Sequence, residues 1–164
     1  MQGSAELAKS LDLKIPMAWE RGYPWHLEPG TGPARTRAVH DVDAGYVMTP
    51  QQQGVRVTSG VELADCDAPL DDRQVEQSIR SARQATSLGN KVEDAPWMGR
   101  RPTLVDSLPM IGAAPHHPGL WFNFGHQHNG LSTSAASAQL LADLFEDKSP
   151  AIDVEAFQPN RFRL

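Results

Sequence analysis

The chain has 164 residues, 40% of them apolar and 21% charged, which excludes a wholly disordered protein and favours a soluble domain with its own core. A net charge of -5 and the lack of a dense Lys or Arg block exclude nucleic acid as an expected partner. Cys66 is the only cysteine, so no internal disulfide is expected, and no apolar run is long enough for an integral membrane segment. We therefore expect a cytoplasmic protein whose contact with a membrane would be peripheral.

Thirteen glycines and thirteen prolines interrupt the sequence too often for a helical bundle, so short helices and strands joined by structured turns are expected. A short helix is predicted from Ser4 to Leu13, ending before Pro16, because proline disfavours helix at the preceding residue. The next segments are predicted, in chain order, as a strand at 17–23, a loop at 26–33, a strand at 35–42, a turn at 43–45 and a short strand at 46–49.

The strongest strand signal lies at residues 55–63, where apolar and polar side chains alternate. Helical spacing follows from Asp71 to Ala85, so we expect a helix that packs on the sheet formed by the strands. Together these features predict an α+β fold with an antiparallel or mixed sheet. The inward residues are predicted to be Val55, Val57, Val61 and Leu63 in the strand and Val75, Ile79, Ala82 and Ala85 in the helix, with Asp71 or Asp72 as N-cap.

The last third of the chain is predicted to form turns over 96–118, a strand over 119–124, a glycine-containing turn over 125–130, a helix over 132–146 and an irregular tail over 153–164. A helix that starts directly after such a turn offers unpaired backbone N–H groups and a positive dipole end, which suit an anion or an electron-rich ring. Helix capping alone explains the same pattern, so local spacing leaves both interpretations open. The inner face of this helix is predicted to consist of Ala135, Ala138, Leu141, Ala142 and Phe145.

Several motifs, taken in order, carry a resemblance to a known family. They lie at 20–23, 97–103, 106–112, 119–121, 125–132 and 157–162, and include Gly99-Arg100-Arg101-Pro102 and Gly125-His126-Gln127-His128-Asn129-Gly130. This series resembles the C-terminal portion of the D-amino-acid oxidase superfamily of FAD-dependent oxidoreductases. Within that superfamily, the D-amino-acid dehydrogenase small-subunit branch is the most similar. The resemblance extends over nearly the whole chain.

What the resemblance implies for the substrate centres on Arg101. In the family, the arginine before proline binds the substrate carboxylate, and a guanidinium suits this role because its planar fork pairs with both carboxylate oxygens. Arg101 is therefore the expected catalytic and substrate-binding residue, with an ordinary salt bridge as the alternative. Arg100 is expected to be structural. Tyr23 and Tyr46 are further candidates for the substrate cavity, although a strand tyrosine usually belongs to the core or its rim.

The resemblance assigns the turn and helix start at 125–132 to the pyrimidine side of the flavin, where backbone N–H groups would stabilise negative charge on the reduced flavin. This sequence has Gln127 where the family commonly has glycine. The His-x-His spacing also suits a metal, but no Cys or Glu at ligand spacing completes a set, so no metal is expected. The expected cofactor-binding residues are Gly125, His126, His128, Gly130, Leu131 and Ser132.

A FAD enzyme of this superfamily needs a Gly-x-Gly-x-x-Gly segment that holds the pyrophosphate, and the present sequence has none. We therefore expect residues 1–16 to be a remnant of the nucleotide-binding domain, 17–100 a substrate-type sheet domain, and 101–164 the strand, turn, helix and tail that end the FAD-binding domain. A truncated gene product, an expressed fragment and a subunit completed by another polypeptide all remain open.

The expected function is that of the C-terminal part of a FAD-dependent amino-acid oxidoreductase, of the D-amino-acid dehydrogenase or oxidase type, inactive alone. Its expected partners are an amino-acid substrate and either a missing FAD-binding polypeptide or a second copy of the chain. Electron transfer would make it peripheral to the inner membrane. The alternative is a non-catalytic domain that binds small carboxylates or mediates oligomerisation, for which an exposed apolar face is expected.

Overall fold

The computed structural model describes residues 3–162 as two compact units. One combines the N-terminal stretch up to Glu20 with the stretch from Arg101 onward, and we call it the hairpin unit. The other, from Arg21 to Arg100, is the sheet unit. The boundaries fall inside strands β1 (Met17–Pro29) and β6 (Gly99–Leu104). None of the helices within residues 3–162 has the length and apolarity needed to cross a membrane.

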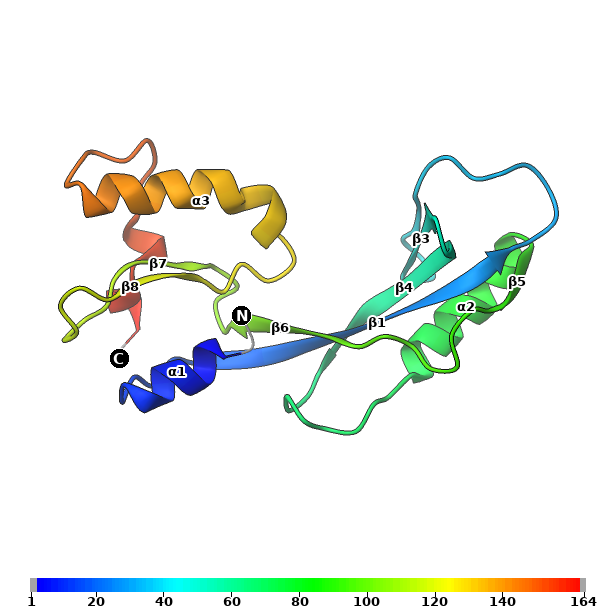
Figure 1. Ribbon diagram of the computed structural model, residues 1–164, viewed down its shortest axis with the longest axis horizontal. Helices are drawn as coiled ribbons and strands as arrows, with labels where there is room; N and C mark the ends of the chain where they lie inside the picture. Colours follow the sequence, from blue (N-terminus) through cyan, green and yellow to red (C-terminus); the bar gives the residue numbers. More distant parts are fainter. Residues whose placement is uncertain (1–2, 163–164) are drawn as a thin grey trace. The chain divides into compact units, whose positions relative to one another are not determined.

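The sheet unit consists of antiparallel strand pairs and one long helix. Its strands are arranged in the order β2-β3-β4-β1-β5, and β6 also pairs with β1. The pairs β2–β3, β3–β4 and β1–β5 are antiparallel, and Figure 1 shows α2 lying along the strands. The mixture of helices and antiparallel sheet is the α+β class that the sequence predicts. The remaining elements are β2 (Val39–Asp41), β3 (Tyr46–Gln51), β4 (Gly54–Leu63), α2 (Arg73–Ala85) and β5 (Leu88–Lys91).

The core of the sheet unit lies between α2 and the strands. Of the four residues of α2 predicted to face inward, Val75, Ile79 and Ala82 are buried, whereas Ala85 in the last turn is exposed. Helix α2 starts after Asp72, and the neighbouring Asp71 accepts the backbone N–H of Arg73 at Oδ1, 3.1 Å away. Burying one face of a sheet and one stripe of a helix together provides the main stabilisation of the unit. The cluster contains Tyr23, Trp25, Leu27, Tyr46, Met48, Val55, Val57, Val75, Ile79 and Ala82.

The hairpin unit pairs β7 (Met110–Ala113) with β8 (Trp121–Phe124) in a two-stranded antiparallel sheet. In Figure 1, α3 (Gly130–Phe145) lies along this hairpin, and β8 leads directly into the turn before α3. The predicted tail contains two short 3-10 helices, η1 (Glu155–Phe157) and η2 (Pro159–Arg161), and its last two residues lie outside the described part. Residues of the first helix, α1 (Ser4–Ser10), complete the core, which contains Ala8, Leu13, Leu104, Met110, Ala114, Phe122 and Phe124.

Several predicted boundaries were wrong. Helix α1 ends at Ser10 instead of Leu13, because Asp12 has a left-handed φ of 57° and the Leu13 N–H returns to Ala8 O at 2.9 Å. Strand β1 continues through the predicted loop as far as Pro29, since its far end pairs with β5. Strand β2 is much shorter than 35–42, and β5, β6 and β7 were not predicted, because tertiary pairing decides such short strands.

The predicted inward face of β4 was correct for its first half only. Val55 and Val57 are buried, but Leu63 is 72% exposed. The carboxylate of Glu62 lies 3.1 Å from Nε of the fully buried Arg21. A buried guanidinium requires a partner, so at this end of β4 the charged side chain turns inward in place of the apolar one.

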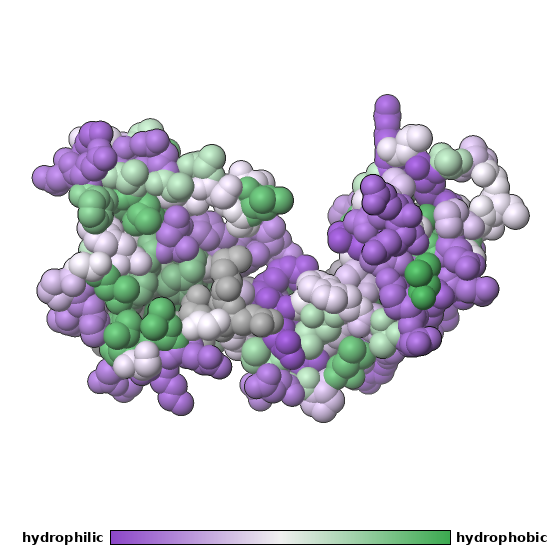
Figure 2. All heavy atoms as spheres, in the orientation of Figure 1, coloured by the Kyte–Doolittle hydropathy of each residue, from purple (hydrophilic) through white to green (hydrophobic). Residues whose placement is uncertain are grey.

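The predicted inner face of α3 was also wrong. The buried residues of this helix are Ser137 and Leu140, whereas the residues predicted to face inward are half-exposed or exposed, with Phe145 68% exposed. Small apolar residues occur all around α3, so its sequence does not specify one inner face. Figure 2 shows apolar residues at both ends of α3 on the face drawn. An apolar stripe of exposed residues therefore runs along this helix: Leu131, Ala135, Ala138, Ala142 and Phe145.

Candidate functional site

Two segments that the sequence singles out, the strand with Arg101 and the turn before α3, lie side by side in the hairpin unit. Thr103 of β6 and His126 of the turn form an isolated antiparallel bridge. Arg101 precedes Thr103 by two residues and shares its face of the strand, because side chains alternate along a strand. Paired residues also point to the same side of a sheet. The structure thus brings Arg101, Thr103 and His126 to one local surface.

The turn is shaped by two residues with positive φ. Gly125 has φ 82°, and a Cβ at this position would lie only 2.9 Å from Leu104 Cδ1, so glycine is required by both conformation and space. Gln127 has φ 49°, a left-handed value that is unfavourable for a side chain with a Cβ. Glycine, which the resemblance expects at this position, would adopt this φ without a steric penalty.

Helix α3 begins without a side-chain cap. Asn129 is the N-cap residue and makes no capping hydrogen bond, while the hydroxyls of Ser132 and Thr133 both donate to Asn129 O. The first helical bond runs from Thr133 N–H to Asn129 O at 2.9 Å. The N–H groups of Gly130, Leu131 and Ser132 are therefore not used within the helix, and the exposed fraction of Leu131 is 93%. This helix start is a donor site for an acceptor or an anion.

Buried polar atoms without a hydrogen-bond partner concentrate at the same place. Of six such atoms in the described residues, four belong to the hairpin unit: Thr103 Oγ1, His126 Nε2, Gln127 Nε2 and Glu20 Oε2, the last of which has the His128 ring as an ion-pair neighbour. Native proteins pair more than nine in ten of their buried polar groups, so a cluster of unpaired ones requires an explanation. A bound ligand that supplies the missing partners is such an explanation.

His126 and Gln127 also line a cavity of about 310 Å³ beneath α3, which is walled mainly by apolar side chains. Burial lowers the pKa of His126 from its ordinary 6.5, so its ring is held in the neutral form. An apolar cavity with a few polar groups at one end is typical of small-molecule sites. The other lining residues are Ser107, Leu108, Pro109, Ile111, Asn129, Thr133, Ala136, Ser137, Leu140, Ile152 and Phe157.

The second histidine of the turn points to a different partner. His128 Nε2 lies 2.7 Å from Oε2 of Glu20 on β1, whose side chain is only 15% exposed. Within residues 3–162, no group of three His, Cys, Asp or Glu side chains is arranged to bind a metal ion. The two histidines of the His-x-His pattern thus contact different strands, β6 and β1.

The two adjacent arginines of β6 differ in their contacts. Arg100 Nε donates to Cys66 O at 2.6 Å, whereas Arg101, half-buried on the opposite face, forms no hydrogen bond or ion pair with another described residue. The guanidinium of Arg101 is therefore available for an external carboxylate, and that of Arg100 ties its strand to the loop after β4.

The two tyrosines predicted to line a substrate cavity lie in the core of the sheet unit. Tyr23 and Tyr46 are 1% and 2% exposed. The Tyr23 hydroxyl donates to Glu62 at 2.5 Å and accepts from Arg21 at 2.7 Å. Burial raises the pKa of both tyrosines. Their role in substrate binding stays a prediction.

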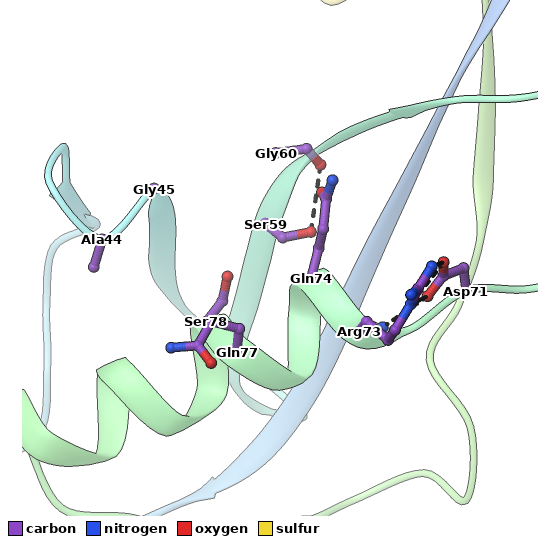
Figure 3. A pocket seen from close by; sticks show the side chains of 9 residues that line it. All are labelled: Ala44, Gly45, Ser59, Gly60, Asp71, Arg73, Gln74, Gln77 and Ser78. Atoms are coloured by element: carbon purple, nitrogen blue, oxygen red, sulfur yellow. Dashed lines mark hydrogen bonds and ion pairs between the residues drawn. The ribbon is translucent and has the colours of Figure 1, made fainter.

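The sheet unit has an open hollow of its own, shown in Figure 3, with a volume of about 480 Å³. Its charged groups neutralise each other, because Arg73 pairs with Asp71 and holds the pKa of that carboxyl at about 2. Gln74 and Gln77 supply most of the remaining polarity. This hollow lacks the unpaired buried groups found at the turn, so the turn is the better candidate.

Sequence reasoning missed Thr103 and Glu20, although both lie in the motifs quoted for the resemblance.

Comparisons with known proteins found a matching family model and several curated relatives. The family model described as FAD dependent oxidoreductase matches residues 3–144. The D-amino-acid oxidase of Bradyrhizobium diazoefficiens, the glycine oxidase of Pseudomonas aeruginosa and the D-amino acid dehydrogenase of Chromohalobacter salexigens are each 32% identical to this chain. The alignments cover 97%, 95% and 95% of the chain but 38%, 43% and 38% of the relatives. The chain thus spans about two fifths of the length of these relatives.

Solved structures show the same fold. The glycine oxidase of Geobacillus kaustophilus superposes with a TM-score of 0.75 at 24% identity, covering 97% of this chain and 43% of that one. The iminodiacetate oxidase of Chelativorans sp. BNC1 gives a TM-score of 0.72 at 21% identity, over 96% of this chain and 43% of that one. With its family model matched over residues 3–144, the chain belongs to the family of FAD-dependent oxidoreductases.

Proposed function

We propose that this chain is the C-terminal portion of an enzyme that oxidises amino acids with FAD, of the D-amino-acid dehydrogenase or oxidase type. The observation that carries the proposal is the bridge between Thr103 and His126, which joins the strand of the unpaired Arg101 to a turn rich in unpaired donors. A carboxylate anchor next to a ring-binding turn is the arrangement that an amino acid and a flavin require.

The residues of the turn fit a flavin. The uncapped N–H groups at 130–132 suit the carbonyl oxygens and the negative charge of a reduced pyrimidine ring, and the apolar cavity suits an aromatic system. The buried amide of Gln127 adds a donor that has no partner among the described residues. Gly125, His126, His128, Gly130, Leu131 and Ser132 remain the residues that we propose for this site. The hydride acceptor of the oxidation is supplied by FAD.

The proposed role of Arg101 is to hold the substrate carboxylate. Its guanidinium has no described partner and can pair with both oxygens of a carboxylate, so it would fix the Cα of the substrate in one orientation. Tyr23 and Tyr46 are buried in the core of the sheet unit, and their contact with substrate stays a prediction.

We further propose that the chain is inactive alone and needs a segment with the Gly-x-Gly-x-x-Gly motif, in this or another polypeptide, to complete the site. In this assignment residues 1–16 and 101–164 belong to the FAD-binding domain and 17–100 to the substrate domain. The exposed apolar stripe of α3, from Leu131 to Phe145, is the surface that we assign to that segment. Exposed apolar patches often mark surfaces that contact another segment or partner.

The proposal is tested by adding FAD to the purified chain and following the backbone amide signals by NMR, together with the flavin absorbance that remains after gel filtration. Shifts are expected at residues 125–132 and at the other residues that line the cavity. Gly125→Ala should reduce them, whereas Gly45→Ala, at a glycine with φ 68° and no atom within 4 Å of an added Cβ, should leave them unchanged. Turn signals that do not respond to saturating FAD contradict the proposal, whereas loss of FAD on gel filtration is expected of a chain without the Gly-x-Gly-x-x-Gly segment.

One specific observation favours a second candidate, a non-catalytic domain that oligomerises. It is the same exposed stripe of α3, which a second copy of the chain would also cover. A dimer that dissociates on Leu131→Asp substitution and binds no FAD favours this candidate. A monomer that responds to FAD favours the enzyme.

A further inference from the structure

The candidate turn is held from two sides by its two histidines. His126 pairs with Thr103 on β6, and His128 contacts Glu20 on β1. Both contacts lie within the hairpin unit. Between them stands Gln127, in a left-handed conformation that is unfavourable for a non-glycine residue. A strained residue persists only when its surroundings fix it, so the contacts on either side determine the shape of the turn.

Glu20 is an unusual residue for a structural role. Its side chain is 15% exposed, and Oε2 has no hydrogen-bond partner of good geometry within the described residues, with His128 Nε2 as its ion-pair neighbour at 2.7 Å. Burying a carboxylate is unfavourable, and removing the partner of a buried charge is strongly so. A carboxylate in this position therefore depends on His128.

The position of Glu20 is also unfavourable for the proposed ligand. The first turn of α3 contains no acidic residue, so Glu20 is the carboxylate held against the turn where negative charge is to be stabilised. The unpaired cation of Arg101 is on β6, and burial holds His126 neutral by lowering its pKa. His128 is thus the group that lies against the Glu20 carboxylate, with Nε2 2.7 Å from Oε2.

We infer that Glu20 and His128 form a positioning pair for the cofactor turn. This inference rests on the proposed function. The pair fixes the backbone at 126–130 so that the free N–H groups of α3 point at the ligand. Neither side chain is assigned a contact with substrate or flavin. His128, expected from the resemblance to bind the cofactor directly, acts in this assignment through the turn.

The experiment combines FAD binding with amide hydrogen exchange on the full chain. Glu20→Ala and His128→Ala are each expected to weaken FAD binding about tenfold and to raise amide exchange at 126–130. The double variant is expected to bind FAD as tightly as either single variant, because the two substitutions break the same contact. Glu20→Gln keeps the shape and a hydrogen-bonding oxygen, so it should restore most of the affinity. A role in overall stability alone would not give this rescue together with non-additivity.

Two matched controls separate the pair from general effects. Glu6→Gln removes an exposed carboxylate of the same unit, and His116→Asn replaces an exposed histidine with φ 62° by a residue that tolerates this conformation. Both should behave as wild type. Additive losses, or unchanged exchange at 126–130 in Glu20→Ala, overturn the positioning pair while leaving the proposed function intact. A wild-type chain that ignores FAD contradicts the proposed function, and the exchange data then decide the pair independently.

Discussion

The two units differ in how fully their buried polar groups are paired. In the sheet unit, Arg21 is fully buried and donates to the carbonyls of Asp65, Ala68 and Pro69 and to the hydroxyl of Tyr23, with Glu62 beside it. At the turn of the hairpin unit, buried groups of three neighbouring residues have no partner within the described chain. A satisfied network stabilises a fold, whereas an unsatisfied one is retained where a ligand completes it.

The largest expected effect comes from breaking the satisfied network. Arg21→Met should lower the free energy of unfolding by about 3–5 kcal/mol, because Glu62 and three loop carbonyls lose their partner. Urea denaturation followed by tryptophan fluorescence measures this change. Arg73→Met is the control, since that side chain is 88% exposed and solvent screens its pair with Asp71. Equal urea midpoints for both variants would contradict the contrast between the units.

The second effect tests the shape of the turn. Gly125→Ala should destabilise the chain by about 2–3 kcal/mol, since it adds the penalty of φ 82° to a 2.9 Å approach to Leu104 Cδ1. Gly45→Ala carries only the conformational penalty of φ 68°, about 1 kcal/mol, because an added Cβ there meets no atom within 4 Å. The difference between the two variants in urea denaturation measures the contact with Leu104. Equal losses would mean that Leu104 moves aside.

The third effect is a pH dependence located at His126. Burial lowers its pKa in the folded chain below the ordinary 6.5, so the unfolded chain binds the proton more readily. Stability from this group is therefore complete above about pH 6.5 and decreases as the pH falls below that value. Urea midpoints should decrease less steeply toward low pH in His126→Asn than in the wild type. Parallel curves for the two proteins would show that His126 does not titrate differently on folding.

The sequence predicted the elements that depend on local spacing and missed those that depend on contacts between distant segments. Local periodicity predicted α2 and the first half of β4, because Val75, Ile79, Val55 and Val57 follow the helix and strand spacings. It failed for β5 and β7, which depend on partners distant in sequence. It also gave the wrong face of α3, where apolar residues surround the helix.

The candidate site was also predicted only in part. The family motifs indicated Arg101 and the turn, but only the structure shows the bridge between Thr103 and His126 and the contact of Glu20 with His128. No local pattern predicts a pairing between residues more than twenty positions apart. The motif at 20–23 contained Glu20, yet nothing in its spacing distinguishes this residue from Arg21, which serves the other unit.

The smallest expected effect comes from relieving the strained residue of the turn. Gln127→Gly removes a Cβ from a backbone with φ 49° and should raise the free energy of unfolding by about 1 kcal/mol. Asp147→Gly, at an exposed residue with φ 55° after α3, should give a similar gain in urea denaturation. The two variants should differ in FAD binding, because only Gln127 has a buried amide nitrogen at the cavity. A Gln127→Gly variant that is more stable but binds FAD less tightly would mean that the strained backbone places the Gln127 amide as a donor to the ligand. Unchanged FAD binding would mean that Gln127 has no part in the site.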